Sequence, residues 1–292
     1  MEHTQVFEEK LTLGADRFLT APLIDTSVAL VVFGAGARFD EVRTKLARLY
    51  GESAELTVDG KKTALSVAVC GEVVEVAPQP DFDKARYNAV DALRVCERLT
   101  RPEDGCPWDR AQTHDSIRVN MIEEAYEAVD AIDKRDVDNM CEEFGDVFLQ
   151  SILHSDIAKR NGEFDFDDVC DGLCKKLISR HTFIFGGDSA GNSDEALTLW
   201  EKAKAVEKKY DTVKNQLERM PDNFPSLLLW QKTYKKLKKA GAAGDPQADF
   251  DAAVSARDYT ALIGACVALL SDGGKDAEIE LNKRIKSIID AL

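Results

Sequence analysis

The pattern of hydrophobic residues changes near Pro78-Gln79-Pro80, and this change limits the folds that the chain can adopt. Before it, short β-prone runs and glycine turns surround one stretch of helical periodicity. From Lys84 onward, apolar residues recur at helical spacing almost without interruption. The sequence therefore predicts a mainly α protein, a helical bundle preceded by a small α/β region.

Residues 1–82 are expected to form the α/β region. Ser27 to Phe33 reads as a strand-like apolar run, Phe39 to Tyr50 has helical periodicity, and Asp59-Gly60 separates two β-prone stretches. Gly34-Ala35-Gly36 follows the first of these strands. Because Phe39 occupies the position of the third glycine in a dinucleotide-binding fingerprint, we interpret this segment as an ordinary glycine turn.

The rest of the chain is expected to be helical, with two or three short helices near its end. The longer helices are expected at 84–99, 115–133, 136–161, 167–181, 193–219 and 225–240. A short connection around Lys134-Arg135 makes the second and third of these helices antiparallel neighbours.

The composition restricts the partners and the compartment. A net charge of -15 over 292 residues argues against nucleic acid and anionic membranes, because both would repel the chain. No run approaches the roughly 18 to 20 apolar residues of a membrane span. Seven cysteines without paired CxxC motifs predict buried, reduced thiols and a cytoplasmic protein.

Two acidic signatures lie on the two neighbouring helices, Glu123-Glu124-Ala125-Tyr126-Glu127 and Glu143-Phe144-Gly145-Asp146. Residues 123–146 contain 10 Asp or Glu in 24 positions, against 53 in 292 overall. Each signature places carboxylates three or four residues apart, so each presents a pair to one helix face. Two such faces brought together would repel each other unless a divalent cation lay between them. The pattern indicates magnesium and a phosphate-bearing substrate, although a solvated face of an acidic protein is the alternative.

Other residues are candidates for substrate contacts. Lys176 and Arg180 lie one helical turn apart and could meet the oxygens of a polyphosphate, or simply complement the dipole at a helix C-terminus. Trp108 could stack on a nucleobase, or belong to a core or dimer interface. The lysines between Lys232 and Lys239 are expected to form a solvated face rather than a nucleic-acid site.

Several segments closely resemble the MazG nucleoside triphosphate pyrophosphohydrolases. They are LTRPEDGCPWDRAQTHDSIRVNMIEEAYEAVDAI, EEFGDVFLQSILHSDIAKRNGEFDF and KKLISRHTFIFG, and the resemblance continues weakly through WEKAKAVEK and FPSLLLWQK. The family's EExxE and ExxD signatures are intact. The resemblance implies an all-α, dimeric module that converts nucleoside triphosphates to monophosphates and pyrophosphate.

The resemblance also implies roles for single residues. Glu124, Glu127, Glu143 and Asp146 would ligate Mg2+, and Glu123 would support them or orient a water molecule. Glu123 or Glu124 could accept the proton of the attacking water. We therefore expect a homodimeric, magnesium-dependent enzyme that hydrolyses the bond between the α- and β-phosphates. The alternative is a nucleotide-binding regulatory or scaffold protein that retains the metal site without turnover.

The chain departs from the family pattern in two places. The family usually has RHPHVF where this chain has Arg180-His181-Thr182-Phe183-Ile184-Phe185, so the chain lacks a proline and a histidine of that pattern. Residues 225–292 look like a second family repeat whose acids have been lost. We therefore expect a catalytic helical domain over 83–220 and a degenerate, structural repeat over 221–292, with no assigned function for 1–82.

Overall fold

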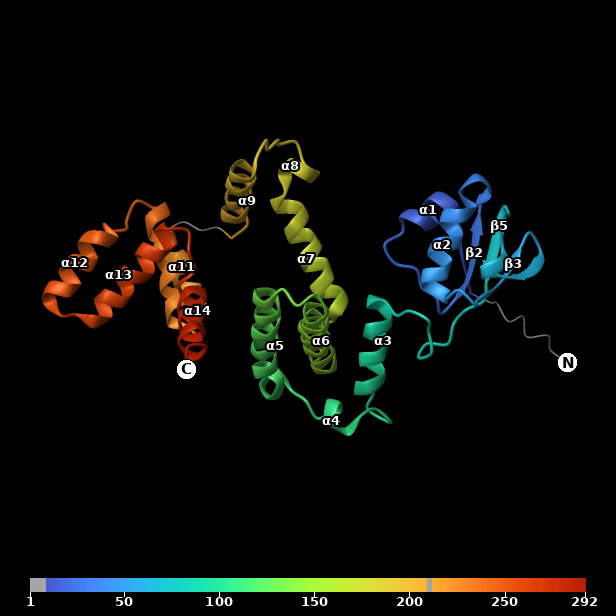
Figure 1. Cartoon of the computed structure of the whole chain (residues 1–292), viewed down its shortest axis with the longest axis horizontal. Coiled ribbons are helices and arrows are strands. Elements are labelled where there is room, and N and C mark those ends of the chain that lie inside the picture. The colour runs from blue at the N-terminus through green and yellow to red at the C-terminus, as the bar shows by residue number, and fades with distance from the viewer. Residues whose placement is uncertain (1–8, 209–211) are drawn as a thin grey trace. The chain divides into compact units, whose positions relative to one another are not determined.

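The computed structural model describes residues 9–208 and 212–292, and it confirms a mainly helical protein with a small sheet near the N-terminus (Figure 1). The chain divides into two compact units, Met1–Gly172 and Leu173–Leu292, which are described in turn. Among the helices of the described ranges, none combines the length and apolar composition that crossing a bilayer requires.

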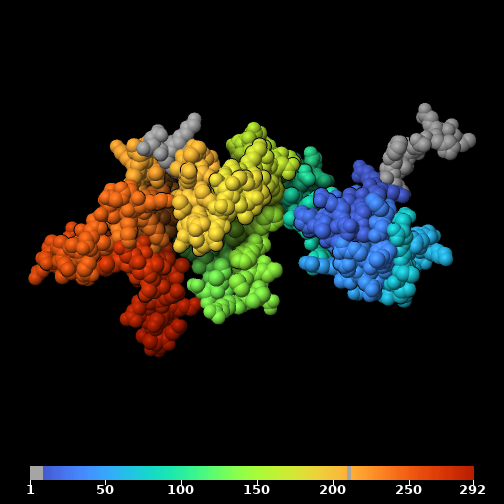
Figure 2. All heavy atoms as spheres, turned by 90° about the horizontal axis from the view of Figure 1, so that it is seen from above, coloured from blue at the N-terminus to red at the C-terminus, as the bar shows by residue number. Residues whose placement is uncertain are grey.

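The N-terminal region contains one mixed sheet whose strand order is β1-β2-β5-β3-β4. The strands are β1 (Lys10–Gly14), β2 (Ala29–Phe33), β3 (Glu55–Val58), β4 (Lys61–Ala64) and β5 (Val73–Val76). β1 and β2 are parallel, and the other neighbouring strands are antiparallel. Figure 2 shows the atoms of this region, drawn in blue, as one closely packed body.

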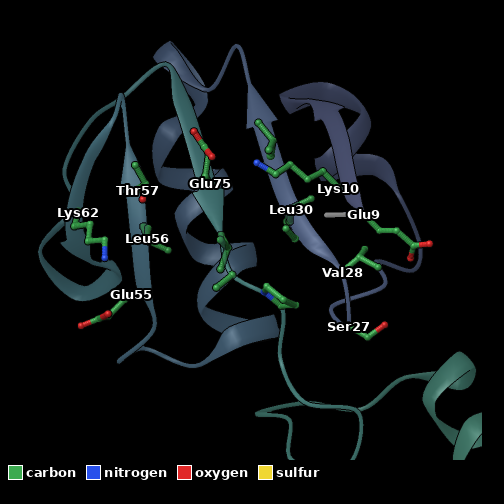
Figure 3. Close-up of a pocket in the computed structure, with 15 residues that line it drawn as sticks. Glu9, Lys10, Ser27, Val28, Leu30, Glu55, Leu56, Thr57, Lys62 and Glu75 are labelled. Carbon is green, nitrogen blue, oxygen red and sulfur yellow. The ribbon is translucent and has the colours of Figure 1, made fainter. Parts of the chain in front are cut away.

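Helices lie against one face of this sheet. They are α1 (Ala15–Thr20) and α2 (Phe39–Tyr50), with short 3-10 turns η1 (Gly36–Arg38) and η2 (Leu65–Val67). The buried side chains between the layers include Phe18, Leu30, Val42, Leu46 and Val74. On the other face, Figure 3 shows Lys10, Thr57, Lys62 and Glu75 among the residues around a hollow of about 600 Å³. The region is therefore a two-layer α/β arrangement.

The sequence predicted much of this region. The helix at Phe39–Tyr50 is confirmed at both ends, and the strand expected from Ser27 begins at Ala29. Asp59 and Gly60 form the turn between β3 and β4 with φ of 47° and 79°, as a type I′ hairpin turn requires. β1 was missed, and residues 1–8 of the predicted region lie outside the described residues.

Helix α3 (Ala89–Thr100) is anchored to the α/β region through its first turn. The helix was expected from residue 84 but begins five residues later, because the Asn88 side chain caps it. Lys84 lies in the preceding loop, where its ammonium donates to Asp91 at 2.6 Å in a fully buried ion pair. The Asn88 amide also donates to the Ile24 carbonyl at 3.1 Å. These bonds hold the start of α3 against the region that precedes it.

The long helices of the first unit are α5 (His114–Lys134) and α6 (Val137–Asn161), which follow the short α4 (Pro107–Arg110). They pack as an antiparallel hairpin, as predicted. Arg135 adopts the left-handed conformation at the turn, and Asp136 caps α6 by accepting from the Asn139 amide. Ile117, Leu153 and Ile157 form the buried cluster near the other end. The hairpin therefore fixes which residues of the two helices face each other.

The first unit ends within α7 (Phe166–Arg180), and the second unit contains the remaining helices. These are α8 (Thr182–Phe185), α9 (Ser193–Lys208), α10 (Val213–Glu218), α11 (Ser226–Lys239), α12 (Pro246–Ala256), α13 (Tyr259–Asp272) and α14 (Ala277–Ile289). The single helix expected at 193–219 is wrong. Thr212 is extended and caps a separate helix by accepting from the Asn215 amide, while 209–211 lie outside the described residues.

Helix α11 is held in the second unit by side-chain bonds to backbone groups. Gln231 is 1% exposed; it donates to the Lys275 carbonyl at 2.7 Å and accepts from the Ala277 amide at 2.9 Å. The Trp230 indole donates to the Gly264 carbonyl at 2.8 Å. These bonds connect α11 with α13 and with the start of α14.

The seven cysteines are all free thiols. Cys96 is buried, but the expectation that the others are buried is wrong. Cys70, Cys141, Cys174 and Cys266 are exposed.

Candidate active site

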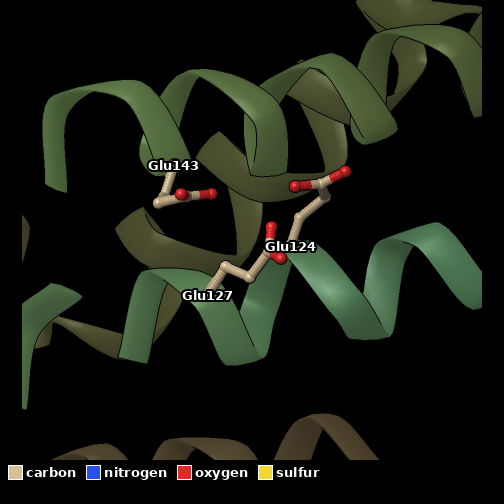
Figure 4. A group of neighbouring side chains, drawn as sticks. All are labelled: Glu124, Glu127 and Glu143. Carbon is tan, nitrogen blue, oxygen red and sulfur yellow. The ribbon is translucent and has the colours of Figure 1, made fainter. Parts of the chain in front are cut away.

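Three carboxylates predicted as metal ligands come together across the α5–α6 hairpin. Glu124 and Glu127 lie one turn apart on α5, and Glu143 lies on α6. One oxygen from each lies within 4.8 Å of the others, and Figure 4 shows the three side chains turned toward the space between the helices. This clustering requires the antiparallel register that the turn at Arg135 sets. Carboxylate oxygens at such spacing suit a hard divalent cation.

The other two predicted acids lie beside this cluster. Asp146 is half-buried one turn along α6 from Glu143, and its charge contributes to the raised pKa of Glu124. Glu123 is exposed on α5 and also contributes to that shift, to a smaller extent. Asp146 and Glu123 are therefore electrostatic neighbours of the three clustered acids.

The acids of the cluster resist ionising together. Partial burial, followed by the negative charges of Asp146 and Glu127, raises the pKa of Glu124 above its usual value of 4.5. Burial, followed by Glu127 and Asp146, also raises the pKa of Glu143, against a hydrogen bond from Asn139 that lowers it. Each raised pKa reflects a surplus of negative charge that a bound proton or cation relieves.

A histidine pair lies at the far end of the same hairpin, and sequence reasoning did not find it. His114 at the start of α5 and His154 on α6 stack with ring centroids 5.1 Å apart and with their Nδ1 atoms at 2.8 Å. The His114 Nε2 lies 3.6 Å from a Glu163 oxygen. Burial, then the neighbouring His114, lowers the pKa of His154. The pair joins the two helices that carry the acids.

Arg180, expected to contact phosphate, has an acidic partner of its own. It is 7% exposed and donates from Nε and Nη2 to the Glu207 carboxylate at 2.8 and 3.0 Å. Its guanidinium lies 5.3 Å from the centre of the Trp200 ring. The hydrogen bond from Arg180 lowers the pKa of Glu207. Arg180 therefore ties α7 to α9.

The remaining two candidates for substrate contacts lie on the surface. Lys176 is exposed on the part of α7 that belongs to the second unit. Trp108 is 59% exposed on α4 in the first unit, where its carbonyl accepts from the Gln112 side chain at 2.8 Å. Their proposed contacts with substrate remain predictions.

Comparison with known proteins identifies the segment that contains the cluster. Residues 112–185 match the family model described as the MazG nucleotide pyrophosphohydrolase domain. The nucleoside triphosphate pyrophosphohydrolase of Escherichia coli K12 is 37% identical over 155 residues, which cover 53% of this chain and 59% of that protein. The nucleoside triphosphate pyrophosphohydrolase/pyrophosphatase MazG of Thermotoga maritima is 47% identical over 118 residues, 40% of this chain and 44% of that protein.

A solved structure described as a MazG-related protein from Thermotoga maritima is 25% identical, with a TM-score of 0.36, and the match covers 40% of this chain and 98% of that one. A score this low does not establish a common fold, so the family assignment depends on the sequence matches. The chain spans about half the length of the curated relatives it matches. The matched residues include both acidic signatures, and residues 112–185 belong to the MazG family as its nucleotide pyrophosphohydrolase domain.

Proposed function

We propose that this protein is a magnesium-dependent nucleoside triphosphate pyrophosphohydrolase, which converts nucleoside or deoxynucleoside triphosphates to monophosphates and pyrophosphate. The proposal depends on the clustering of Glu124, Glu127 and Glu143 across two helices, where one carboxylate oxygen from each lies within 4.8 Å of the others. The names of the E. coli and T. maritima relatives support the same activity.

The donor set fits a magnesium ion because it consists of carboxylate oxygens from two helices packed against each other. Glu124, Glu127 and Glu143 would hold the ion, with Asp146 as the fourth ligand. A bound divalent ion supplies a Lewis acid that polarises the α-phosphoryl group and lowers the pKa of a water molecule. Glu124 or Glu123 would accept the proton of that water.

The proposal is tested by a panel of the common nucleoside triphosphates with magnesium, in which monophosphate, pyrophosphate and orthophosphate are measured separately. Glu127→Gln should abolish pyrophosphate release while circular dichroism remains unchanged. Asp133→Asn, an exposed acid on the same helix, is the matched control and should retain turnover. Orthophosphate as the first product, or full activity in Glu127→Gln, would refute the proposal.

One observation favours a second candidate, a nucleotide-binding regulatory or scaffold protein without turnover. Arg180, in the segment that departs from the family pattern, donates two hydrogen bonds to the Glu207 carboxylate. If this pairing persists with substrate, the polyphosphate loses a predicted cationic contact. Calorimetry with magnesium and nucleotide separates the candidates, because binding without pyrophosphate release identifies the regulator.

The oligomeric state and the compartment belong to the same proposal. Large apolar side chains on α5 and α6 are left exposed within this chain: Met121, Ile122, Val129, Ile132, Val137 and Phe144. We infer a homodimer that covers them, which sedimentation would measure. The four exposed free thiols support a reducing, cytoplasmic setting.

We also propose that 221–292 is a degenerate repeat of the catalytic hairpin. Arg257 between α12 and α13 has the same φ of 55° and ψ of 31° as Arg135, and Asp258 caps the next helix as Asp136 does. The two turns lie 122 residues apart (257 − 135). At this offset Glu124, Glu127, Glu143 and Asp146 correspond to Pro246, Asp249, Ala265 and Ala268. One acid of four is left, which supports a structural role.

A further inference from the structure

A groove with a cationic lining lies in the second unit, among α9, α10 and α11, and measures about 950 Å³. Six lysines from two helices line it: Lys202, Lys204, Lys232, Lys235, Lys236 and Lys239. Arg219 adds a seventh cationic side chain, and Glu201 is the acid among the described residues of the lining. The lysines of α11 were expected to form a simple solvated face. All of them except Lys236 are exposed, as expected, and several also line the groove together with lysines of α9.

Among the described residues, one carboxylate pairs with a lysine of the groove. Glu201 lies 3.5 Å from Lys239 in an exposed ion pair. Lys236 and Lys204 are both half-buried. Burial, followed by the charge of Lys204, lowers the pKa of Lys236, with further contributions from Lys232 and Lys239 and an opposing one from Glu201. The groove therefore gathers like charges that a bound anion would stabilise.

The net charge of the whole chain favours the binding of a short anion in the groove over the binding of a long one. The net charge of -15 repels an extended polyanion such as a nucleic acid, which would reach beyond the lysines. Electrostatic interactions are screened over about 8 Å at physiological ionic strength, so a compact anion inside the groove feels mainly the local lysines. Lysine ammonium groups bind phosphate oxygens as flexible point charges, which suits a linear polyphosphate.

Part of the groove is apolar. Val213, Met220 and Phe224 are half-buried lining residues, and the Lys232 ammonium lies 5.6 Å from the centre of the Phe224 ring. A nucleobase could rest on this apolar part while its phosphates meet the lysines. The lining thus accepts a bare polyphosphate or the polyphosphate chain of a nucleotide.

We propose that the groove among α9, α10 and α11 binds a linear polyphosphate, either pyrophosphate and its longer homologues or the triphosphate of a nucleotide. None of the residues that line the groove belongs to the acidic cluster. The inference is independent of the proposed function, because it requires neither magnesium nor turnover.

The test is isothermal calorimetry on the full chain in EDTA, where metal-dependent binding at the acidic cluster cannot occur. The ligands are tripolyphosphate, pyrophosphate, ATP and AMP. Affinity should rise with the number of phosphates, and Lys232→Gln/Lys236→Gln should weaken tripolyphosphate binding about tenfold or more. The matched control is Lys214→Gln/Lys283→Gln, which removes two exposed lysines outside the groove.

The two sources of polyphosphate are separated by comparing ATP with tripolyphosphate. Equal affinities identify the phosphate chain alone as the ligand, whereas tighter ATP binding identifies a nucleotide whose base uses the apolar part. Unchanged affinity in Lys232→Gln/Lys236→Gln, or no binding by the wild type, would overturn the inference. So would tighter binding of a single-stranded RNA oligomer than of tripolyphosphate. Glu127→Gln should bind normally in EDTA, so failure of the proposed hydrolysis leaves this result unaffected.

Discussion

Replacing Glu127 by Gln should change the stability of the first unit in opposite directions without and with magnesium. In the metal-free protein one carboxylate oxygen from each of Glu124, Glu127 and Glu143 lies within 4.8 Å of the others, so removing one charge relieves repulsion. The melting temperature of Glu127→Gln in EDTA should therefore lie at or above that of the wild type. With magnesium, the variant lacks one ligand and should gain much less stability than the wild type.

The magnitude follows from the linkage between binding and folding. A cation that binds only the folded state stabilises it by about 2.7 kcal/mol when its concentration is about 100 times its dissociation constant. For a unit the size of Met1–Gly172, each 1 kcal/mol shifts the melting temperature by about 2–4 °C. Saturating magnesium should thus raise the melting temperature of the wild type by roughly 5–10 °C.

Differential scanning calorimetry in EDTA and in a magnesium series measures both effects. Asp133→Asn removes an exposed charge from the same helix and should keep the full magnesium increment. If Glu127→Gln gains as much stability from magnesium as the wild type does, Glu127 is not a ligand. If magnesium leaves the wild type unchanged, the cluster is a solvated acidic face.

Three further sets of side chains have measurable effects on stability. In EDTA, the raised pKa of Glu124 and of Glu143 favours the protonated carboxyl groups in the folded state. The free energy of unfolding of the wild type, relative to that of Glu124→Gln/Glu143→Gln, should therefore fall as pH rises from about 4 through the raised pKa values. Urea denaturation measures this difference, and a difference that stays constant with pH would contradict the expectation. Gln231→Leu leaves the buried Ala277 amide and the Lys275 carbonyl without their side-chain partner and should cost about 1–3 kcal/mol in the second unit, measured by calorimetry. Asp91→Asn leaves the buried Lys84 charge unpaired and should cost about 3–5 kcal/mol in urea denaturation, and adding Lys84→Met should recover much of the loss.

The sequence predicted the features that depend on local periodicity and on turn chemistry. The helical spacing over 115–133 and 136–161 located both long helices to within one residue at each end. The short connection at Arg135 required them to be antiparallel, and this register is sufficient to bring Glu127 and Glu143 together. The acidic cluster was thus predictable because two local patterns and one turn determine it.

Partners that depend on packing between distant elements were not predictable in the same way. The charge of Arg180 suggested a phosphate contact, but its burial against Trp200 and its pairing with Glu207 depend on where α9 lies. The lysines of α11 read as an outward face because helical periodicity describes one helix alone, whereas the groove depends on the lysines of α9 as well.

The histidine pair falls between these two cases. An antiparallel turn at Arg135 brings the start of α5 near the later turns of α6. The predicted helices alone therefore place His114 beside the C-terminal half of α6. The stacked contact with His154 additionally requires the two rings to share one face, which the helical register determines. A residue pair of this kind can therefore be found from sequence once a turn is fixed, whereas the partner of Arg180 requires the packing of separate helices. The same distinction explains why the candidate metal ligands were found and the cationic groove was not.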